Sequence, residues 1–315
     1  MTMHSRPTIL VLGPTAGGKT SLSIELARRL EGGGDCCCAD SMQVYRHMDI
    51  GTAKPTAAEQ AAAPHHLLDL VEPNEVFTVD DWLAAARPCI DSIGASGRWP
   101  IVVGGTNLYV QALCGGFMQG PEPDPELRTE LEATDPVRLR AELERIDPEA
   151  AERIHPNDLR RTVRAIEVHR LSGQPLSALQ GQWAAANKLD DMLLIGLEWP
   201  VEAINRRINA RVRTMMEHGF LEEVRRLHAN GQLGPQATEA LGYKQLISHL
   251  EGDLDLETAV EQIKIRTRRF AKQQRTWLRK FRHLWGGCWL DAESDDAQDV
   301  ANNALKYIAS RCGQA

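Results

Sequence analysis

Ile-Leu-Val-Leu-Gly-Pro-Thr-Ala-Gly-Gly-Lys-Thr, residues 9–20, is the stretch that decides the fold of this chain. Its first four residues form a short apolar run that predicts a buried strand, and Leu22, Leu26 and Leu30 follow at helical spacing. The residues between match G-x-x-x-x-G-K-[ST] at every fixed position, in the strand–loop–helix context that binds phosphate. The predicted phosphate loop consists of Gly13, Pro14, Thr15, Ala16, Gly17, Gly18, Lys19 and Thr20.

The chemistry of this loop suits an anion. Glycines let the backbone curl so that its N–H groups point inward, and the N-terminus of the next helix adds partial positive charge. Lys19 supplies a full charge, and the Thr20 hydroxyl is a candidate ligand for Mg²⁺. Taken alone, the loop favours a nucleotide site, with ATP as the first candidate. It does not identify the phosphate compound.

Composition places the chain among soluble globular proteins. Its 315 residues suggest about two domains, and 43% apolar residues are enough for a sizeable core. No apolar run approaches the roughly 20 residues of a membrane-spanning helix, and the first residues lack the form of a signal peptide. We therefore expect a cytoplasmic protein without a membrane partner, and we expect a monomer.

The metal-binding patterns are weak. None of the seven cysteines forms a C-x-x-C pair, which argues against a structural zinc site. Cys36–Cys38 is interpreted as part of a buried strand, because free cysteine packs as a small hydrophobe. His65, His66 and Asp69 are a poor metal pattern, and we interpret them as local contacts.

Strands and helices alternate along the first half of the chain. Cys36–Ala39 reads as a strand that ends at Asp40, and Thr78 with Asp81 reads as the cap of a helix running to about residue 94. Residues 100–103 read as another strand, followed by Gly104-Gly105-Thr106. The alternation predicts an α/β fold with a parallel sheet flanked by helices, similar to P-loop NTPases.

Residues 121–190 interrupt this pattern with helical stretches separated by Asp-Pro pairs. Leu193–Leu197 reads as a strand that returns to the sheet, and the pattern from Val201 to the end is helical. We therefore expect a core of residues 1–120 and 191–315, with 121–190 as an inserted helical lobe.

One predicted helix is strongly basic. Residues 263–283 carry nine lysines and arginines and no acid, in a chain of net charge −7. Aromatic residues are interleaved with these cations. The helix is interpreted as a surface for a nucleic-acid backbone, or as a solvated helix that packs through its aromatics, or as both on opposite faces.

Two candidate catalytic residues follow predicted strands. The strand at 101–103 does not end in the acid that positions Mg²⁺ in many nucleotide hydrolases. Asp40 is therefore a candidate general base, with a cap or a metal ligand as alternatives, and Thr106 is a candidate hydroxyl partner or a turn residue. Arg207 and Arg211 lie four apart on one helix face and are either phosphate ligands or surface cations.

Ordered blocks of the chain resemble the bacterial type of the tRNA dimethylallyltransferase family. They are the phosphate loop, Asp40–Arg46, Met48–Pro55, His65–Asp69, Gly104–Tyr109, Asn157-Asp158, Arg161, Arg164–Val168, Gly242–Gln245, Thr267–Lys272 and Thr276–Arg279. The resemblance covers nearly the whole chain. Two departures are Gly17, where the family more often has serine, and residues 115–120, which lack the usual Gly-Leu-Ser sequence.

The resemblance implies a reaction in which dimethylallyl diphosphate donates its prenyl group to N6 of adenosine 37 in tRNAs that read codons beginning with U. The products would be N6-(dimethylallyl)adenosine and diphosphate, with Mg²⁺ as cofactor and the anticodon stem-loop as partner. The phosphate loop would hold the leaving diphosphate, and Asp40 would accept the N6 proton. The implied tRNA contacts are Asp40, Ser41, Met42, Gln43, Thr106, Arg128, Arg164, Ala165, Ile166, Glu167, Val168, Gly242, Tyr243, Lys244 and Gln245.

Three competing interpretations remain at this stage. One is a small-molecule kinase or NTPase, and another is a related enzyme that prenylates free adenine nucleotides. A third is an RNA-binding module that keeps the loop only for its shape. The basic helix and the insertion favour a macromolecular acceptor, and Asp40 with Thr106 favours catalysis.

Overall fold

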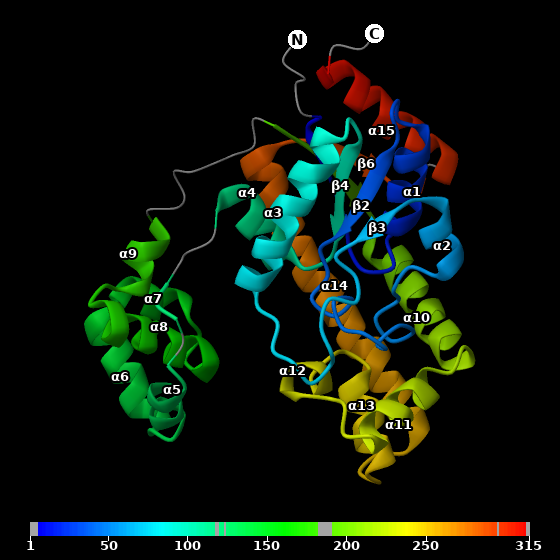
Figure 1. Ribbon diagram of the computed structural model, residues 1–315. Coiled ribbons are helices and arrows are strands. Elements are labelled where there is room, and N and C mark those ends of the chain that lie inside the picture. Colours follow the sequence, from blue (N-terminus) through cyan, green and yellow to red (C-terminus); the bar gives the residue numbers. More distant parts are fainter. Residues whose placement is uncertain (1–5, 117–119, 123, 182–190, 295, 313–315) are drawn as a thin grey trace. The chain divides into compact units, whose positions relative to one another are not determined.

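The computed structural model describes residues 6–116, 120–122, 124–181, 191–294 and 296–312 (Figure 1). The chain divides into two compact units, the core unit (residues 1–110 and 189–315) and the inserted unit (residues 111–188). Of the segment expected as an insertion, residues 182–190 lie outside the described part. Within the described residues, no helix has the length and apolar character needed to cross a membrane.

A parallel sheet forms the centre of the core unit, in the order β3-β2-β4-β1-β5-β6. Leu10 in the central strand lies opposite Val102 on one side and Leu194 on the other. The predicted parallel α/β sheet is confirmed, and all its strand pairs in the described residues are parallel. The strands are β1 (Thr8–Leu12), β2 (Gly34–Cys38), β3 (His65–His66), β4 (Trp99–Gly104), β5 (Met192–Glu198) and β6 (Cys288–Asp291).

Alternate strand residues bury against helices on opposite faces of the sheet, as the two-residue period of a strand requires. Ile9, Ile101 and Ile195 belong to a core with α1 (Lys19–Arg29) and α15 (Ala297–Cys312). On the other face, α3 (Val79–Ala95) packs against β2 and β4 (Figure 1). The three consecutive cysteines of β2 are buried, as predicted.

The other helices of the core unit lie in the chain segments that connect one strand to the next. They are α2 (Ala57–Ala62), α4 (Asn107–Gly115, which crosses into the inserted unit), α10 (Val201–Glu217), α11 (Phe220–Ala229), α12 (Pro235–Thr238), α13 (Tyr243–Leu250) and α14 (Leu256–Trp285). The long basic helix α14 packs against α10 and α13 (Figure 1). The predicted Thr78–Asp81 cap is present as a reciprocal capping box at the start of α3.

The inserted unit is helical in its described residues. Asp124, Asp135 and Asp147 each cap a helix whose first residue is the following proline, so the Asp-Pro pairs mark helix starts. Leu139, Leu143 and Ile166 belong to the buried core of this unit. Its helices are α5 (Pro125–Glu132), α6 (Pro136–Ile146), α7 (Pro148–Arg153), α8 (Leu159–Ser172) and α9 (Leu176–Gly181).

Two strands of the sheet, β3 and β6, are not predicted from the sequence. The segment from Val201 onward was expected to be entirely helical, but β6 (Cys288–Asp291) pairs with β5. The short β3 (His65–His66) pairs with β2 at the opposite edge. Both are edge strands of four residues or fewer, too short to show a period. Leu290 is the only residue of the two that is fully buried.

Candidate active site

The phosphate loop joins β1 to α1 at the carboxyl edge of the sheet. Gly18 has a φ of 88°, a left-handed conformation that glycine adopts without strain. At Gly17 a Cβ would lie 2.8 Å from the Pro14 carbonyl oxygen and 3.3 Å from Trp199 Nε1. Glycine therefore fits this position, where the family pattern more often has serine.

Side chains from the chain segment after β5 hold the loop from outside. Trp199 Nε1 donates to the Gly17 carbonyl oxygen at 3.0 Å, and Arg207 Nε donates to the Ala16 carbonyl oxygen at 2.8 Å. The Arg207 guanidinium also stacks on the Trp199 ring, 4.6 Å from its centroid. These contacts satisfy two loop carbonyls, so Arg207 braces the loop as well as lining the cavity described below.

Two cations at this loop have no carboxylate partner in the described residues. Lys19 Nζ donates to the carbonyl oxygens of Gly13 (3.1 Å) and Pro14 (2.9 Å). Burial, together with the nearby charge of Arg211, lowers the pKa of Lys19 to about 8, against the opposing charge of Asp40. Burial also lowers the pKa of Arg211. This excess of positive charge on two partly buried cations favours binding of an anion.

Asp40 and Thr106 follow neighbouring strands, β2 and β4. Asp40 Oδ1 accepts the backbone N–H groups of Met42 (2.9 Å) and Gln43 (3.4 Å), which fixes the carboxylate at the turn. Thr106 Oγ1 accepts the backbone N–H of Ser41 at 2.9 Å and donates to Ser41 Oγ at 3.2 Å. The Thr106 hydroxyl therefore joins the two turns instead of bonding its own backbone.

A cavity of about 890 Å³ opens beside these groups, within the core unit. Of the phosphate loop, the two arginines and the predicted catalytic and tRNA-contact residues at the turns after β2 and β4, its walls include Thr15, Ala16, Gly17, Gly18, Lys19, Thr20, Asp40, Gln43, Arg207 and Arg211. Gly13, Pro14, Ser41, Met42 and Thr106 do not line it. The cavity thus brings both candidate arginines, the loop lysine and the candidate base into one space.

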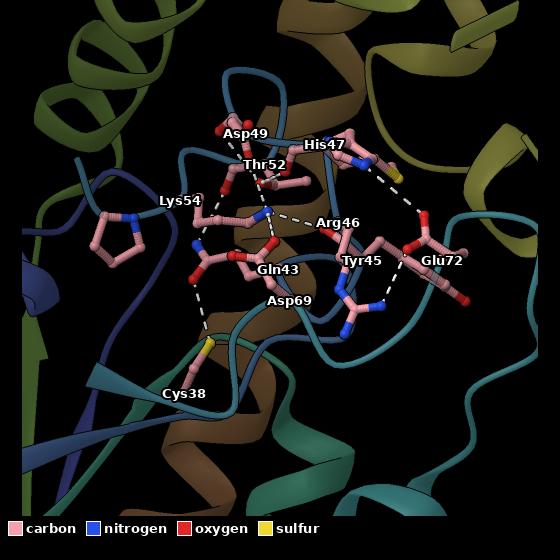
Figure 2. Close-up of polar contacts among 12 residues, drawn as sticks. Cys38, Gln43, Tyr45, Arg46, His47, Asp49, Thr52, Lys54, Asp69 and Glu72 are labelled. Carbon is pink, nitrogen blue, oxygen red and sulfur yellow. Dashed lines mark hydrogen bonds and ion pairs between the residues drawn. The ribbon is translucent and has the colours of Figure 1, made fainter. Parts of the chain in front are cut away.

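Lys54 forms another wall of the same cavity and is a residue that the motif analysis did not single out. Its side chain is 4% exposed and donates to Tyr45 O at 2.9 Å and to the carboxylates of Asp49 and Asp69, each at 2.6 Å (Figure 2). All three ammonium protons therefore have acceptors. The charge of this lysine is neutralised within the protein.

Gln43 holds the same segment from the side of β2. Its Nε2 donates to the carbonyl oxygens of Thr52 (3.1 Å) and Ala53 (3.2 Å), and its Oε1 accepts the Cys38 thiol at 3.2 Å (Figure 2). Both ends of the Gln43 amide are therefore engaged inside the protein. Its predicted tRNA contact stays a prediction.

Glu223 of α11 anchors the segment 49–54, and the sequence motifs did not identify it either. Its carboxylate accepts the backbone N–H groups of residues 49, 50 and 51 and the hydroxyl of Tyr243. Gly51 permits this approach, because a Cβ there would collide with the Phe220 ring. A sequence signal existed: Glu223 lies on the apolar face of α11 between Phe220 and Val224.

The predicted tRNA contacts in α8 are divided by burial. Glu167 is fully buried and accepts Arg128 Nη2 and Arg164 Nη1, each at 2.7 Å. Burial alone would raise the pKa of Glu167, but the two arginines outweigh it and the net shift is downward. Arg128 and Arg164 remain partly exposed. The neighbouring side chains with no exposed surface are Ala165, Ile166 and Val168.

The segment 242–245 shows the same division. Tyr243 is fully buried and packs edge-on against Phe220, and Gln245 is buried with its Oε1 accepting the Gly242 N–H. Lys244 is exposed and pairs with Glu239. Of the three side chains in this predicted contact, Lys244 is the one that reaches solvent.

Helix α14 has one packed face and one basic face. Ala271, Gln274 and Leu278 are buried along one side. The cations exposed to solvent are Arg266, Arg269, Lys272, Arg279, Lys280 and Arg282, the last of which pairs with Glu198. The mixed interpretation of this helix therefore matches its geometry, although contact with a nucleic acid stays a prediction.

Candidate metal donors at the cavity are hard oxygen atoms, the Thr20 hydroxyl and the Asp40 carboxylate. No group of three or more His, Cys, Asp or Glu side chains suited to a metal occurs in the described residues. His66 instead bonds Asp35, and Asp69 bonds Lys54. Mg²⁺ typically takes few protein ligands and completes its shell with water and phosphate oxygens, so this donor set fits it.

Comparison with known proteins covers almost the whole chain. The model of the family described as IPP transferase matches residues 43–281. A tRNA dimethylallyltransferase of Anaeromyxobacter dehalogenans (strain 2CP-C) is 48% identical over 303 residues, spanning 95% of this chain and 99% of the relative. The chain is therefore similar in sequence to a full-length enzyme.

Solved structures agree with this likeness. The tRNA isopentenylpyrophosphate transferase from Bacillus halodurans is 38% identical, with a TM-score of 0.71 over 98% of each chain. A eukaryotic dimethylallyltransferase, described as acting on tRNA, has a TM-score of 0.82 at 30% identity and covers 97% of this chain and 78% of its own. The likeness thus extends across the bacterial and eukaryotic enzymes.

Proposed function

The chain belongs to the IPP transferase family, and we propose that it transfers a dimethylallyl group from dimethylallyl diphosphate to tRNA. The acceptor atom is N6 of adenosine 37 in tRNAs that read codons beginning with U. The products are N6-(dimethylallyl)adenosine and diphosphate. Because its substrate is tRNA, we place the protein in the cytoplasm.

One observation carries this proposal: a phosphate loop shares a cavity with a carboxylate on the adjacent turn, and its partly buried cations have no carboxylate partner among the described residues. Lys19 and Arg211 supply the positive charge, and Asp40 supplies the base. A nucleotide hydrolase needs a positioned water, whereas a prenyl transfer needs a base near the acceptor amine. We assign Asp40 to the second role.

In the proposed step, one N–C bond forms, one C–O bond breaks and one proton is transferred. The amine N6 attacks C1 of the dimethylallyl group, the C1–O bond to diphosphate breaks, and the N6 proton passes to Asp40. Charge develops on the diphosphate oxygens as that bond breaks, so the loop amides with Lys19 and Arg211 stabilise the leaving group. The Asp40 carboxylate is held for this role by the two backbone N–H groups on its Oδ1.

Mg²⁺ fits the Thr20 hydroxyl at the edge of the loop, where water and diphosphate oxygens would complete its shell and leave Asp40 to act as the base. When bound, it would neutralise negative charge on the diphosphate. Arg207 keeps the loop in shape through Ala16 O and contributes charge at the same wall.

The acceptor side requires an adenine that has left its stack, because an enzyme acting on a base commonly extrudes it into a pocket. The exposed cations of α14 are suited to the phosphate backbone of the anticodon stem-loop. Arg128 and Arg164 are the candidates from the inserted unit, since their guanidinium groups reach the surface there.

The test is transfer of labelled dimethylallyl from its diphosphate, in the presence of Mg²⁺, to an undermodified anticodon stem-loop with adenosine at tRNA positions 36 and 37. We expect one N6-modified adenosine per stem-loop and an equal yield of diphosphate. A stem-loop with guanosine in place of adenosine 37 is the matched control and should accept no label. Hydrolysis of ATP without prenyl transfer would replace the proposal with an NTPase function.

A further inference from the structure

Gln274 connects two loops that are far apart in the sequence. Its side chain is 2% exposed, on the packed face of α14. Its Oε1 accepts the backbone N–H of Thr15 at 2.8 Å, and its Nε2 donates to the carbonyl oxygen of Gly105 at 2.9 Å. One amide therefore bonds the phosphate loop and the turn after β4 at once.

The chemistry of this bridge is specific to a primary amide. One planar group presents an acceptor to Thr15 and a donor to Gly105, and a primary amide carries an oxygen acceptor and an N–H donor side by side. Gly105 leaves the room for it, because a Cβ there would lie 2.5 Å from Gln274 Nε2. That same Cβ position is 3.9 Å from Lys19 Nζ, so the bridge lies beside the loop ammonium.

The backbone of α14 is fixed at this point by contacts one turn earlier. Ala271 is fully buried in a cluster with Ile204 and Ile208 of α10, against which Ala16 and Trp199 also pack. The helix that carries Gln274 is thus packed against the phosphate loop independently of the hydrogen bonds of Gln274. The amide spans from a rigid support to both loops.

We propose that Gln274 is a positioning residue that sets the spacing between the diphosphate loop and the turn that carries Thr106. The inference rests on the proposed prenyl transfer. It assigns the Thr15 N–H to Gln274 and so removes that amide from the donors available to diphosphate. Through Ser41 the Thr106 turn is bonded to the Asp40 turn, so the spacing extends to the candidate base.

The first test compares Gln274→Met with Gln273→Met, a matched control at the exposed neighbouring position. Methionine keeps the length of the side chain and removes both hydrogen bonds. We expect Q274M to weaken binding of inorganic diphosphate with Mg²⁺ by about tenfold and to lower kcat by about 10²-fold, the effect of a small misplacement of reacting groups. KM for the stem-loop should change less than about twofold, because no tRNA contact is removed.

Gly105→Ala breaks the same bridge from its other end and covers the case in which Q274M does not fold. In a double-mutant cycle, G105A and Q274M should show strong coupling, with the double variant no slower than the slower single variant. Additive effects of the two substitutions would overturn the proposal. So would a Q274M protein with a lower melting temperature but the diphosphate affinity and kcat of Q273M.

Failure of the proposed function has a different signature. If wild type and Q273M bind diphosphate but transfer no prenyl group, the prenyl-transfer assignment fails. The diphosphate affinities of Q274M and G105A then still decide whether Gln274 positions the loop: weakened binding supports that role, and unchanged binding overturns it.

Discussion

Two lysines line the same cavity and differ in what neutralises them. Lys19 at the phosphate loop donates to backbone carbonyl oxygens and has no carboxylate partner in the described residues. Lys54 on the facing wall is held between Asp49 and Asp69. Lys54 is buried and Lys19 is partly buried, so both ammonium groups have lost much of their water, and loss of water alone does not distinguish a ligand-binding cation from a structural one.

The two sites differ in how much of the lysine's positive charge is neutralised by carboxylates of the protein. Removing a charge from water costs several kcal/mol unless a partner offsets it. At Lys54 that partner is part of the protein, so the lysine fixes the segment 49–54. At Lys19 no carboxylate of the described residues forms an ion pair, the charge of Asp40 offsets the loss only in part, and the pKa is lowered to about 8, so an anionic ligand can provide the rest. The first wall is therefore structural and the second is suited to diphosphate.

The largest expected effect is that of Lys19→Met on the donor. We expect kcat/KM for dimethylallyl diphosphate to fall by about 10³-fold, or about 4 kcal/mol, because a charge that stabilises the leaving group is lost. The free energy of unfolding should fall by no more than about 1 kcal/mol, since the two hydrogen bonds to loop carbonyls are lost but an uncompensated charge is removed with them. Steady-state kinetics and urea unfolding of the same samples measure both, and a stability loss without a kinetic loss would reverse the assignment of this lysine.

Arg211→Met is expected to act in the same direction with a smaller effect. This arginine makes no ion pair or hydrogen bond in the described residues. The carboxylate whose charge acts most strongly on its pKa is that of Asp40. We expect KM for the donor to rise by about 30-fold, with kcat for a saturating donor reduced much less. An unchanged donor KM would show that Arg211 serves only the wall of the cavity.

Lys54→Met tests the structural side of the comparison. Two carboxylates lose their partner, but each is about half exposed and regains water, so we expect a stability loss of about 2 kcal/mol, below the range for a fully buried pair. The control is Arg28→Met, which removes a surface pair with Glu25 and should cost less than about 1 kcal/mol. Equal losses in the two variants would contradict a structural role for Lys54.

The smallest expected effect concerns Glu167 of the inserted unit, whose carboxylate neutralises Arg128 and Arg164. The pKa of Glu167 is lowered from its ordinary value of 4.5, with Arg164 and Arg128 outweighing the opposing effect of burial. A carboxylate with a lowered folded-state pKa stabilises above its unfolded pKa and loses that contribution as pH falls through the folded one.

Protection of α8 amides from hydrogen exchange should therefore weaken below about pH 4.5 in the wild type. In Glu167→Gln this pH dependence should largely disappear, while Glu144→Gln, in a surface pair, should keep it. Wild-type protection that is constant down to about pH 3 would contradict the assignment.

Much of the core could be predicted because local signals agreed there. The apolar run before Gly13, the glycine pattern and the following helix face each pointed to the same strand–loop–helix unit. The Thr78–Asp81 pair located the start of α3, because a capping box is a local interaction between residues three apart. Edge strands such as β6 gave no such signal, since four residues show neither period nor full burial.

The missed residues of the site share a different cause. Glu223, Gln274 and Lys54 each bond groups that are distant in the sequence or lie in irregular loops, and a polar residue on a helix reads by default as solvent-facing. Conversely, family likeness predicted tRNA contacts at residues such as Ile166, whose side chain is fully buried. A shared sequence block does not separate residues that touch a ligand from those that hold its fold.

The most direct test of the Lys19 site is calorimetric titration of inorganic diphosphate with Mg²⁺ into wild type, Lys19→Met and Lys54→Met at about pH 7, below the lowered pKa of Lys19. We predict that K19M binds about 10²-fold more weakly, equivalent to about 2.7 kcal/mol, while K54M stays within about threefold of wild type. Equal weakening in both variants, or wild-type affinity in K19M, would contradict the claim that the uncompensated lysine at the phosphate loop is the diphosphate site.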